Sequence, residues 1–250
     1  MTALRRLPLP DDRLQAAFEL TPPCRMAADI GADHGRLSAL LLGRERCERM
    51  LVSDISPSAL SKARQRLHSL GLEDRCAFAV ADGLGALDQL APQSPTVQAF
   101  CILGMGGDTI AGILACGQAR LEGATLVLGP HTEAPLVRAR VAQIGYRITE
   151  ERLAGVGRYL YVLMQAQPAP SPVVYTEREL LLGPCLLASP PPLARPWLER
   201  MLANLLAYFD GVRALPEERK TEPYQRNVRH LAYVRELLDR LPQLGKEESP

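Results

Sequence analysis

Two aspartates flank a glycine turn near the start of the chain, within the sequence Asp29-Ile30-Gly31-Ala32-Asp33-His34-Gly35. The apolar run 26–30 predicts a buried strand that enters this turn, and the run 37–42 predicts a helix after it. Glycine lets the backbone approach a bound nucleotide where a Cβ would collide. The spacing differs from the Gly-x-Gly-x-x-Gly turn that holds a pyrophosphate, and two carboxylates would repel one. S-adenosylmethionine carries a sulfonium and an ammonium but no phosphate, so the turn favours this methyl donor over NAD.

Two later acids occupy similar positions after predicted strands. Asp54 ends the run 49–54 and precedes Ile55, and Asp82 with Gly83 ends the run 78–83. A carboxylate at the end of the second strand of a doubly wound sheet accepts hydrogen bonds from ribose hydroxyls, which is the role that we expect for Asp54. We expect Asp82 to accept a hydrogen bond from an adenine amino group. One such acid is often only a helix cap, but three in order predict a cofactor site.

A glycine cluster follows the next apolar run. Residues 97–103 predict a central strand, which ends in Gly104-Met105-Gly106-Gly107-Asp108 before a predicted helix over 109–116. A tight turn alone explains one or two of these glycines, whereas three within four residues favour close contact with a ligand. The predicted cofactor-binding residues are therefore Asp29, Gly31, Gly35, Asp54, Ile55, Asp82, Gly83, Gly104, Met105 and Gly106.

The remaining strands complete an α/β fold. Residues 124–128 predict a fifth strand that ends in Gly129-Pro130-His131, and a helix is expected over 134–144. The segments 146–153 and 158–167 predict a closing antiparallel hairpin. Antiparallel strands at the edge of a mostly parallel sheet fit a class I, Rossmann-like methyltransferase better than a dehydrogenase.

Proline-rich sequence separates this region from a helical end. We expect a catalytic domain over 1–167, a linker over 168–192, and a C-terminal helical hairpin, a short antiparallel coiled coil, over 193–250. The hairpin carries a run of basic residues, which is either a solvated face or a surface for nucleic acid; its members are Arg219, Lys220, Arg226, Arg229 and His230.

Composition excludes several classes of protein. The 250-residue chain has a net charge of +1, so no overall basic field indicates nucleic-acid binding. Its six cysteines show neither a Cys-x-x-Cys pair nor ligand spacing with the four histidines, which predicts free thiols in a reducing cytosol and no metal site. No apolar run approaches the roughly 20 residues needed to span a bilayer. We therefore expect a cytoplasmic protein.

Four motifs together resemble the TrmK family, bacterial tRNA methyltransferases that modify N1 of adenine 22. They are Ala28-Asp29-Ile30-Gly31-Ala32-Asp33-His34, Asp82-Gly83-Leu84, Gly104-Met105-Gly106-Gly107 and Leu182-Gly183-Pro184. The resemblance covers almost the whole chain and implies tRNA as substrate. Two positions depart from the family: Asp54 replaces a typical glutamate, and Gly129-Pro130-His131 replaces Gln-Pro-Asn.

Asp33 and His34 are the predicted catalytic residues. N1 of adenine has an available lone pair, so methyl transfer needs alignment more than a strong base. After transfer the ring is cationic, and a carboxylate such as Asp33 stabilises that charge or accepts an amino proton. His34 would position the base by a hydrogen bond or by stacking. The simpler interpretations are that Asp33 caps the helix beginning near Gly35 and that His34 only packs.

Substrate binding is predicted at His131 and at Arg219, Lys220, Arg226 and Arg229. Tyr159 and Tyr161 are candidate stacking surfaces. We expect strand alternation to turn one of them toward the core. Further candidate phosphate contacts are Arg5, Arg6, Arg13, Arg138 and Arg140. Two other functions remain open at this point: a class I methyltransferase with another acceptor, and a nicotinamide oxidoreductase or a binding module without catalysis.

Overall fold

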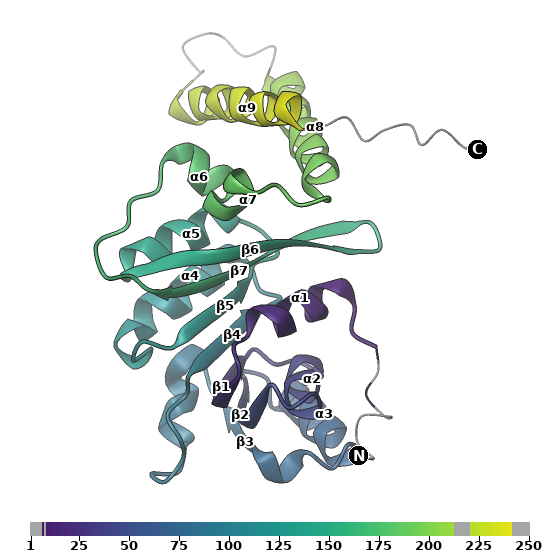
Figure 1. Cartoon of the computed structure of the whole chain (residues 1–250), viewed down its shortest axis with the longest axis vertical. Helices are drawn as coiled ribbons and strands as arrows, with labels where there is room; N and C mark the ends of the chain where they lie inside the picture. Colours follow the sequence, from purple (N-terminus) through teal and green to yellow (C-terminus); the bar gives the residue numbers. More distant parts are fainter. Residues whose placement is uncertain (1–6, 8, 213–220, 242–250) are drawn as a thin grey trace, which may run out of the picture. The chain divides into compact units, whose positions relative to one another are not determined.

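The computed structural model describes residues 7, 9–212 and 221–241, and the chain divides into two compact units, 1–175 and 176–250. The described part of the first unit contains one sheet of seven strands in the order β3-β2-β1-β4-β5-β7-β6 (Figure 1). The strands are β1 (Cys24–Ile30), β2 (Cys47–Asp54), β3 (Cys76–Val80), β4 (Ala99–Leu103), β5 (Thr125–Gly129), β6 (Tyr146–Val156) and β7 (Tyr159–Pro168).

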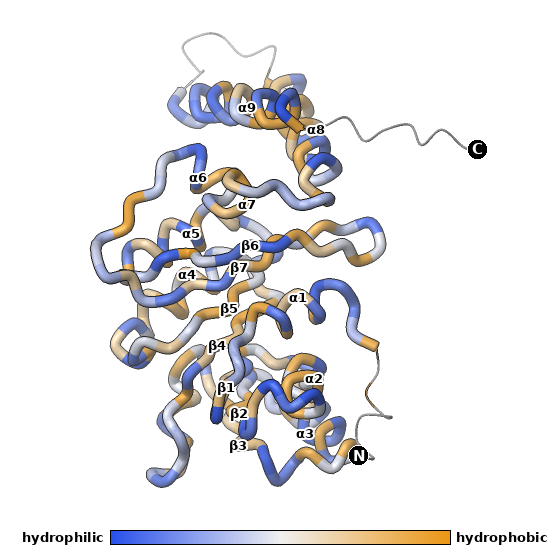
Figure 2. Tube along the Cα trace, in the orientation of Figure 1, coloured by the Kyte–Doolittle hydropathy of each residue, from blue (hydrophilic) through white to orange (hydrophobic). Residues whose placement is uncertain are grey.

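The first five strands are parallel, and β6 and β7 form an antiparallel hairpin at one edge. Helices cover both faces, which is why the central strands are continuously apolar (Figure 2). One face carries α1 (Asp12–Leu20), α2 (Arg36–Gly43) and α3 (Pro57–Ser69), and the other carries α4 (Gly107–Gly117) and α5 (Ala134–Gln143). The predicted class I fold is confirmed, including the closing hairpin.

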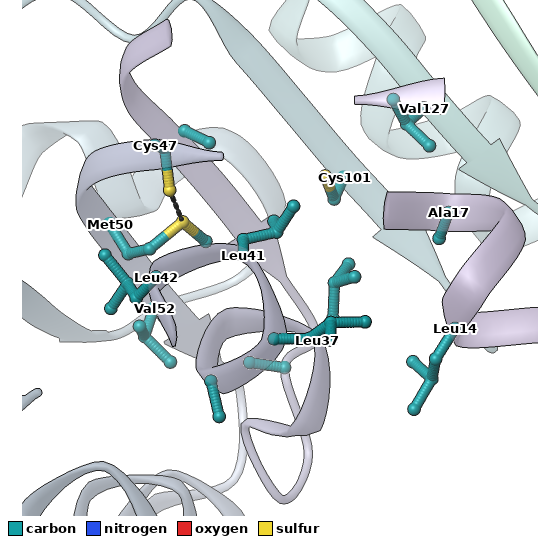
Figure 3. Packing of buried hydrophobic residues seen from close by; sticks show 14 of the residues in the cluster. Leu14, Ala17, Leu37, Leu41, Leu42, Cys47, Met50, Val52, Cys101 and Val127 are labelled. Atoms are coloured by element: carbon teal, nitrogen blue, oxygen red, sulfur yellow. Dashed lines mark hydrogen bonds between the residues drawn. The ribbon is translucent and has the colours of Figure 1, made fainter. Parts of the chain in front are cut away.

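The main core lies between the sheet and helices α1, α2 and α3. Leu14 and Ala17 of α1 and Leu37 and Leu41 of α2 are buried in one cluster with side chains of the central strands, including Val127 (Figure 3). Helix α1 begins at Asp12 because Asp11 accepts a hydrogen bond from the Leu14 amide as its N-cap. This core fixes the ends of β1, β2 and β4, where the candidate site lies.

The second unit is helical. Its helices are α6 (Glu177–Leu182), α7 (Pro184–Ala188), α8 (Ala194–Val212) and α9 (Glu222–Arg240). Arg195 at the start of α8 donates to the carbonyls of Leu238 and Leu241 at the end of α9, while Phe209 and Tyr224 meet at the opposite ends. The two long helices are therefore antiparallel, as the predicted hairpin requires.

The expected domain limits differ from the division of the structure. The segment 168–192, predicted as a linker, contains α6 and α7, and the units divide between Tyr175 and Thr176. Helix α6 begins at this place because Thr176 and Glu179 form a capping box, which prolines earlier in the segment do not reveal. A separate catalytic domain, linker and hairpin remain a prediction about independent folding.

Candidate functional site

A cavity of about 520 Å³ lies at the carboxyl ends of the parallel strands. The strand order reverses between β1 and β4: β2 and β3 lie on one side of β1, and β4 and β5 lie on the other. Open α/β sheets bind ligands at this crossover point. Most of the predicted site residues line the cavity: Asp29, Gly31, Asp33, His34, Asp54, Ile55, Asp82, Gly83, Gly104, Met105 and His131. Residues as far apart in the sequence as Asp29 and His131 thus line one cavity.

Gly35 and Gly106 are not part of the cavity wall. Gly35 is the N-cap of α2, with φ of 64°, and a Cβ built on it would lie 3.0 Å from the Cβ of Ala63. Its missing side chain therefore lets α2 and α3 approach each other. Gly106 is the extended N-cap residue before α4, and an added Cβ would meet Thr132 at an ordinary contact distance. Their cofactor-binding role remains a prediction.

Asp29 is a buried carboxylate at the end of β1. Its side chain accepts a hydrogen bond from Ser38 Oγ at 2.6 Å, and the residue is 4% exposed. Burial raises the pKa of Asp29 to about 6, partly offset by the hydrogen bonding from Ser38, with a smaller contribution from the nearby Asp54 charge. The ionised form of Asp29 is thus destabilised by burial, and a positively charged partner would stabilise it.

Asp54 is held rigidly where β2 ends. Its Oδ2 accepts a hydrogen bond from the Asp33 amide at 3.0 Å, and its Oδ1 accepts one from the Ser56 amide at 2.8 Å. The amides of Gly31 and Ala32 also donate to the Ser53 carbonyl. The turn after β1 and the end of β2 therefore form one hydrogen-bonded unit, and Asp54 is fixed in position to accept further hydrogen bonds.

Asp33 and His34 form an exposed pair at the cavity. Asp33 Oδ2 lies 2.6 Å from His34 Nδ1, and the side chains are 71% and 45% exposed. The His34 carbonyl accepts a hydrogen bond from Arg66 Nε at 2.8 Å, which anchors the turn to α3. Because the N-cap of α2 is Gly35, Asp33 does not act as the helix cap. A carboxylate and an imidazole here are accessible to a second substrate.

Gly31 shows why glycine is required after β1. Its φ is +74°, and a Cβ built on it would lie 2.0 Å from Met105 Cε. Met105 in turn accepts a hydrogen bond from the His131 amide at 2.8 Å through its carbonyl. The turns after β1, β4 and β5 therefore pack together, with Met105 between them.

His131 has two partners on the cavity wall. Its Nε2 lies 3.1 Å from Arg13 Nη1, and its ring lies 5.5 Å from the Tyr161 ring, centroid to centroid. Partial burial and the Arg13 charge lower the pKa of His131, so its neutral form is favoured. Because a guanidinium only donates, Nε2 is the acceptor in this contact.

The sequence interpretation did not place Arg13 in the cavity. Arg13 lies on α1, a helix that the sequence patterns above do not predict. It is 118 positions from His131 in the sequence. The available signal was Asp11 as an N-cap before Leu14, Ala17 and Phe18 at helical spacing.

One expectation about nucleic-acid contacts is wrong, and another holds for a different reason. Arg138 is completely buried and pairs with the equally buried Glu151 at 2.8 Å, so it cannot contact a phosphate. Strand alternation does not separate Tyr159 from Tyr161, because residues two apart on a strand share a face. Tyr161 nevertheless packs against the core, whereas Tyr159 is exposed. Their ring centroids are 6.4 Å apart. Arg5 and Arg6 lie outside the described residues.

The basic residues of the second unit differ in their environment. Arg229 donates to both carboxylate oxygens of Glu177 and to Glu222, which raises its pKa further above the ordinary value. His230 also contacts Glu177, although burial lowers its pKa. Arg226 is exposed, whereas Arg219 and Lys220 lie outside the described residues. Of the two described candidates, Arg229 already serves to join α9 to α6.

Among the described residues, no group of three or more His, Cys, Asp or Glu is arranged to hold a metal ion. No helix in the described ranges is long and apolar enough to cross a membrane. All six cysteines are free thiols.

Residues 10–164 match the family model described as a methyltransferase domain. The chain belongs to the methyltransferase-domain family. A Bacillus subtilis relative named tRNA (adenine(22)-N(1))-methyltransferase is 26% identical over 179 residues, which are 70% of this chain and 73% of the relative.

Solved structures of this methyltransferase family show the same fold. The B. subtilis m1A22 tRNA methyltransferase TrmK superposes with a TM-score of 0.78 at 22% identity, over 94% of this chain and 100% of that one. M. capricolum TrmK in complex with S-adenosylhomocysteine gives 0.79 at 19% identity, over 93% and 99%. The resemblance to TrmK is thus confirmed along nearly the whole chain, including the helical end.

Proposed function

We propose that this protein transfers a methyl group from S-adenosylmethionine to N1 of adenine at position 22 of tRNA. The observation that carries the proposal is the cavity at the β1–β4 crossover, where Asp29, Asp33 and Asp54 meet glycine turns without any phosphate-binding motif. The acceptor is inferred from the B. subtilis relative, whose name specifies that base and that atom.

The cavity residues suit this methyl donor. Within the described part of the chain, the buried carboxylate of Asp29 is hydrogen-bonded to Ser38 and pairs with no cation, and a ligand with ammonium and sulfonium groups would supply one. Asp54, fixed by two amides, would accept hydrogen bonds from the ribose hydroxyls, and Asp82 would accept one from the adenine amino group. Gly31 and Gly104 leave space where side chains would enter the cavity.

When bound, S-adenosylmethionine supplies the electrophilic methyl group. Alignment of that group with adenine N1 provides much of the rate, because the nitrogen already has a free lone pair. Asp33 would stabilise the positive charge that develops on the adenine ring. His34, which contacts Asp33, would hold the base in position, and neutral His131 would contact it without adding a second positive charge.

Nucleoside mass spectrometry of tRNA treated with the protein and a labelled methyl donor tests the proposed function. We expect labelled 1-methyladenosine, and replacement of adenine 22 in the transcript should abolish it. Label on another nucleoside would contradict the assigned acceptor atom. Label found only on protein or on small molecules would show that the protein is a class I methyltransferase with another acceptor.

Replacing Asp29 by asparagine is expected to stabilise the free protein while weakening cofactor binding. The folded-state pKa of about 6 lies above the ordinary value of 3.8, so protonated Asp29 contributes stability that is lost as pH rises through 6. The variant should therefore unfold at a higher temperature above pH 6, with a gain of up to about 3 kcal/mol. The difference should vanish toward pH 4. A wild type that is more stable than the variant at pH 7 would contradict this account.

Arg226 and Arg229 are expected to behave differently when each is replaced by alanine. If Arg226 contacts a phosphate, its loss should reduce the salt dependence of tRNA binding by about one unit of log–log slope. Arg229→Ala should instead release Glu177 and speed amide hydrogen exchange in α6. Equal salt slopes for Arg226→Ala and the wild type would remove Arg226 from the RNA-binding surface.

We infer the cytoplasm as the location of this activity. Free thiols at all six cysteines are typical of a reducing compartment.

A further inference from the structure

The β6–β7 hairpin carries aromatic side chains toward the cavity. β5 pairs with β7 only from Met164 to Ala166, so the part of β7 that begins at Tyr159 continues beyond β5, paired with β6 (Figure 1). Tyr159, near the turn, is 48% exposed. Its ring centroid lies 6.4 Å from that of Tyr161, which lies 5.5 Å from that of His131 at the cavity wall. We call these three residues the aromatic series.

Two guanidinium groups accompany the aromatic series. Arg158 lies 5.1 Å from the Tyr159 ring and donates to its hydroxyl at 2.9 Å. Arg13 lies 5.4 Å from the Tyr161 ring and contacts His131. The series therefore has a cation at its outer end and another at the cavity.

Two carboxylates lie on the same face of the hairpin as the aromatic series. Glu19 and Glu150 both pair with Arg152, which lies across from Leu163 in the strand register. Because cross-strand partners share a face, this cluster lies on the side of the sheet that bears the tyrosines. The single guanidinium of Arg152 offsets only one of these two carboxylates, so the phosphate contacts of the series would come from Arg13 and Arg158 and not from this cluster.

Rings beside cations are a general means of binding single-stranded nucleic acid. Aromatic side chains stack on bases of any sequence, while guanidinium groups contact phosphates. Double-stranded RNA would not offer its base faces to such a surface, since its bases are stacked on one another. The features favour an unpaired RNA segment over a protein partner, because they combine exposed rings with donors that suit phosphate.

We propose that the aromatic series binds the unpaired nucleotides next to the adenine that enters the cavity. The inference rests on the proposed function and adds to it a surface for the substrate. A base removed from the RNA stack loses a few kcal/mol of stacking, and its neighbours lose a partner as well. Tyr159 would stack on a neighbouring base, and Arg158 and Arg13 would contact the phosphates on either side. The target base would pass His131 to reach Asp33.

Methyl-transfer kinetics on full-length tRNA test the aromatic series at Tyr159. Tyr159→Ala should raise the KM for tRNA about tenfold, since stacking on one base is lost. The turnover at saturating tRNA and the dissociation constant of S-adenosylmethionine should stay within about twofold, because Tyr159 does not line the cavity. Tyr159→Trp should restore the KM, since it keeps a stacking face without the hydroxyl.

Two comparisons separate this proposal from its alternatives. Arg158→Ala should weaken tRNA binding and flatten its salt dependence, whereas Arg147→Ala, an exposed arginine at the other end of the same hairpin, should change neither. An unchanged KM in Tyr159→Ala, or equal effects of the two arginine variants, would overturn the aromatic series while the wild type still methylates tRNA. A wild type that transfers no methyl group to tRNA would instead overturn the proposed function.

Discussion

Replacing Asp33 by asparagine is expected to lower the turnover of methyl transfer about a hundredfold or more, at saturating cofactor and tRNA. The exposed carboxylate lies beside the cavity and is placed to face the adenine ring as that ring becomes cationic. The dissociation constant of S-adenosylmethionine should change less than about threefold, because Asp33 holds Asp54 through its backbone amide, which asparagine keeps. Rapid-quench measurement of a single turnover isolates this effect.

Asparagine is the informative replacement because Asp33 has a φ of 47°. Asparagine and aspartate tolerate this left-handed conformation better than other residues with a Cβ, so Asp33→Asn removes the charge and keeps the turn. Asp33→Ala would add backbone strain to the loss of charge. His34→Gln serves as a comparison, since it keeps a hydrogen-bonding side chain beside Asp33. Equal losses of turnover and of cofactor affinity in Asp33→Asn would make Asp33 a cofactor ligand only.

The grouping of the strand-end residues around one cavity could be predicted from sequence because its signals are local. Asp29 and Gly31 are adjacent to the strand that positions them, and the same holds for Asp54 and for Gly104. In a parallel sheet, the carboxyl ends of the strands lie at one edge. Once the strands are recognised, the residues at these ends are therefore expected to lie close together. The left-handed φ of +74° at Gly31, which residues with a Cβ rarely adopt, is the physical reason for the glycine.

The acceptor side could not be predicted in the same way. Arg13 meets His131 only because α1 packs against the sheet beside β5 and β7, which no short sequence pattern records. Arg138 looked like a surface charge, yet it is buried because Glu151 of β6 lies opposite to pair with it. The sequence likewise suggests that Arg229 is available for RNA, but Arg229 is paired with Glu177 of α6. Contacts between distant elements decide which charges are available.

Replacing Asp54 by alanine is expected to raise the dissociation constant of S-adenosylmethionine about tenfold to a hundredfold. Each charge-assisted hydrogen bond to a ribose hydroxyl contributes about 1.5–3 kcal/mol. The carboxylate is already oriented by the amides of Asp33 and Ser56, so little conformational entropy is lost when the ribose binds. Isothermal titration with the cofactor measures the change directly.

Asp54→Glu is the matched control for this prediction, because it changes the length of the side chain and keeps its charge. It should retain most of the affinity, since the carboxylate is kept. Asp54→Ala also removes the acceptor for the Asp33 amide, so it should lower turnover even when the cofactor is saturating. Unchanged affinity in Asp54→Ala would remove Asp54 from the cofactor site. A loss of turnover without a loss of affinity would assign Asp54 to support of the catalytic turn alone.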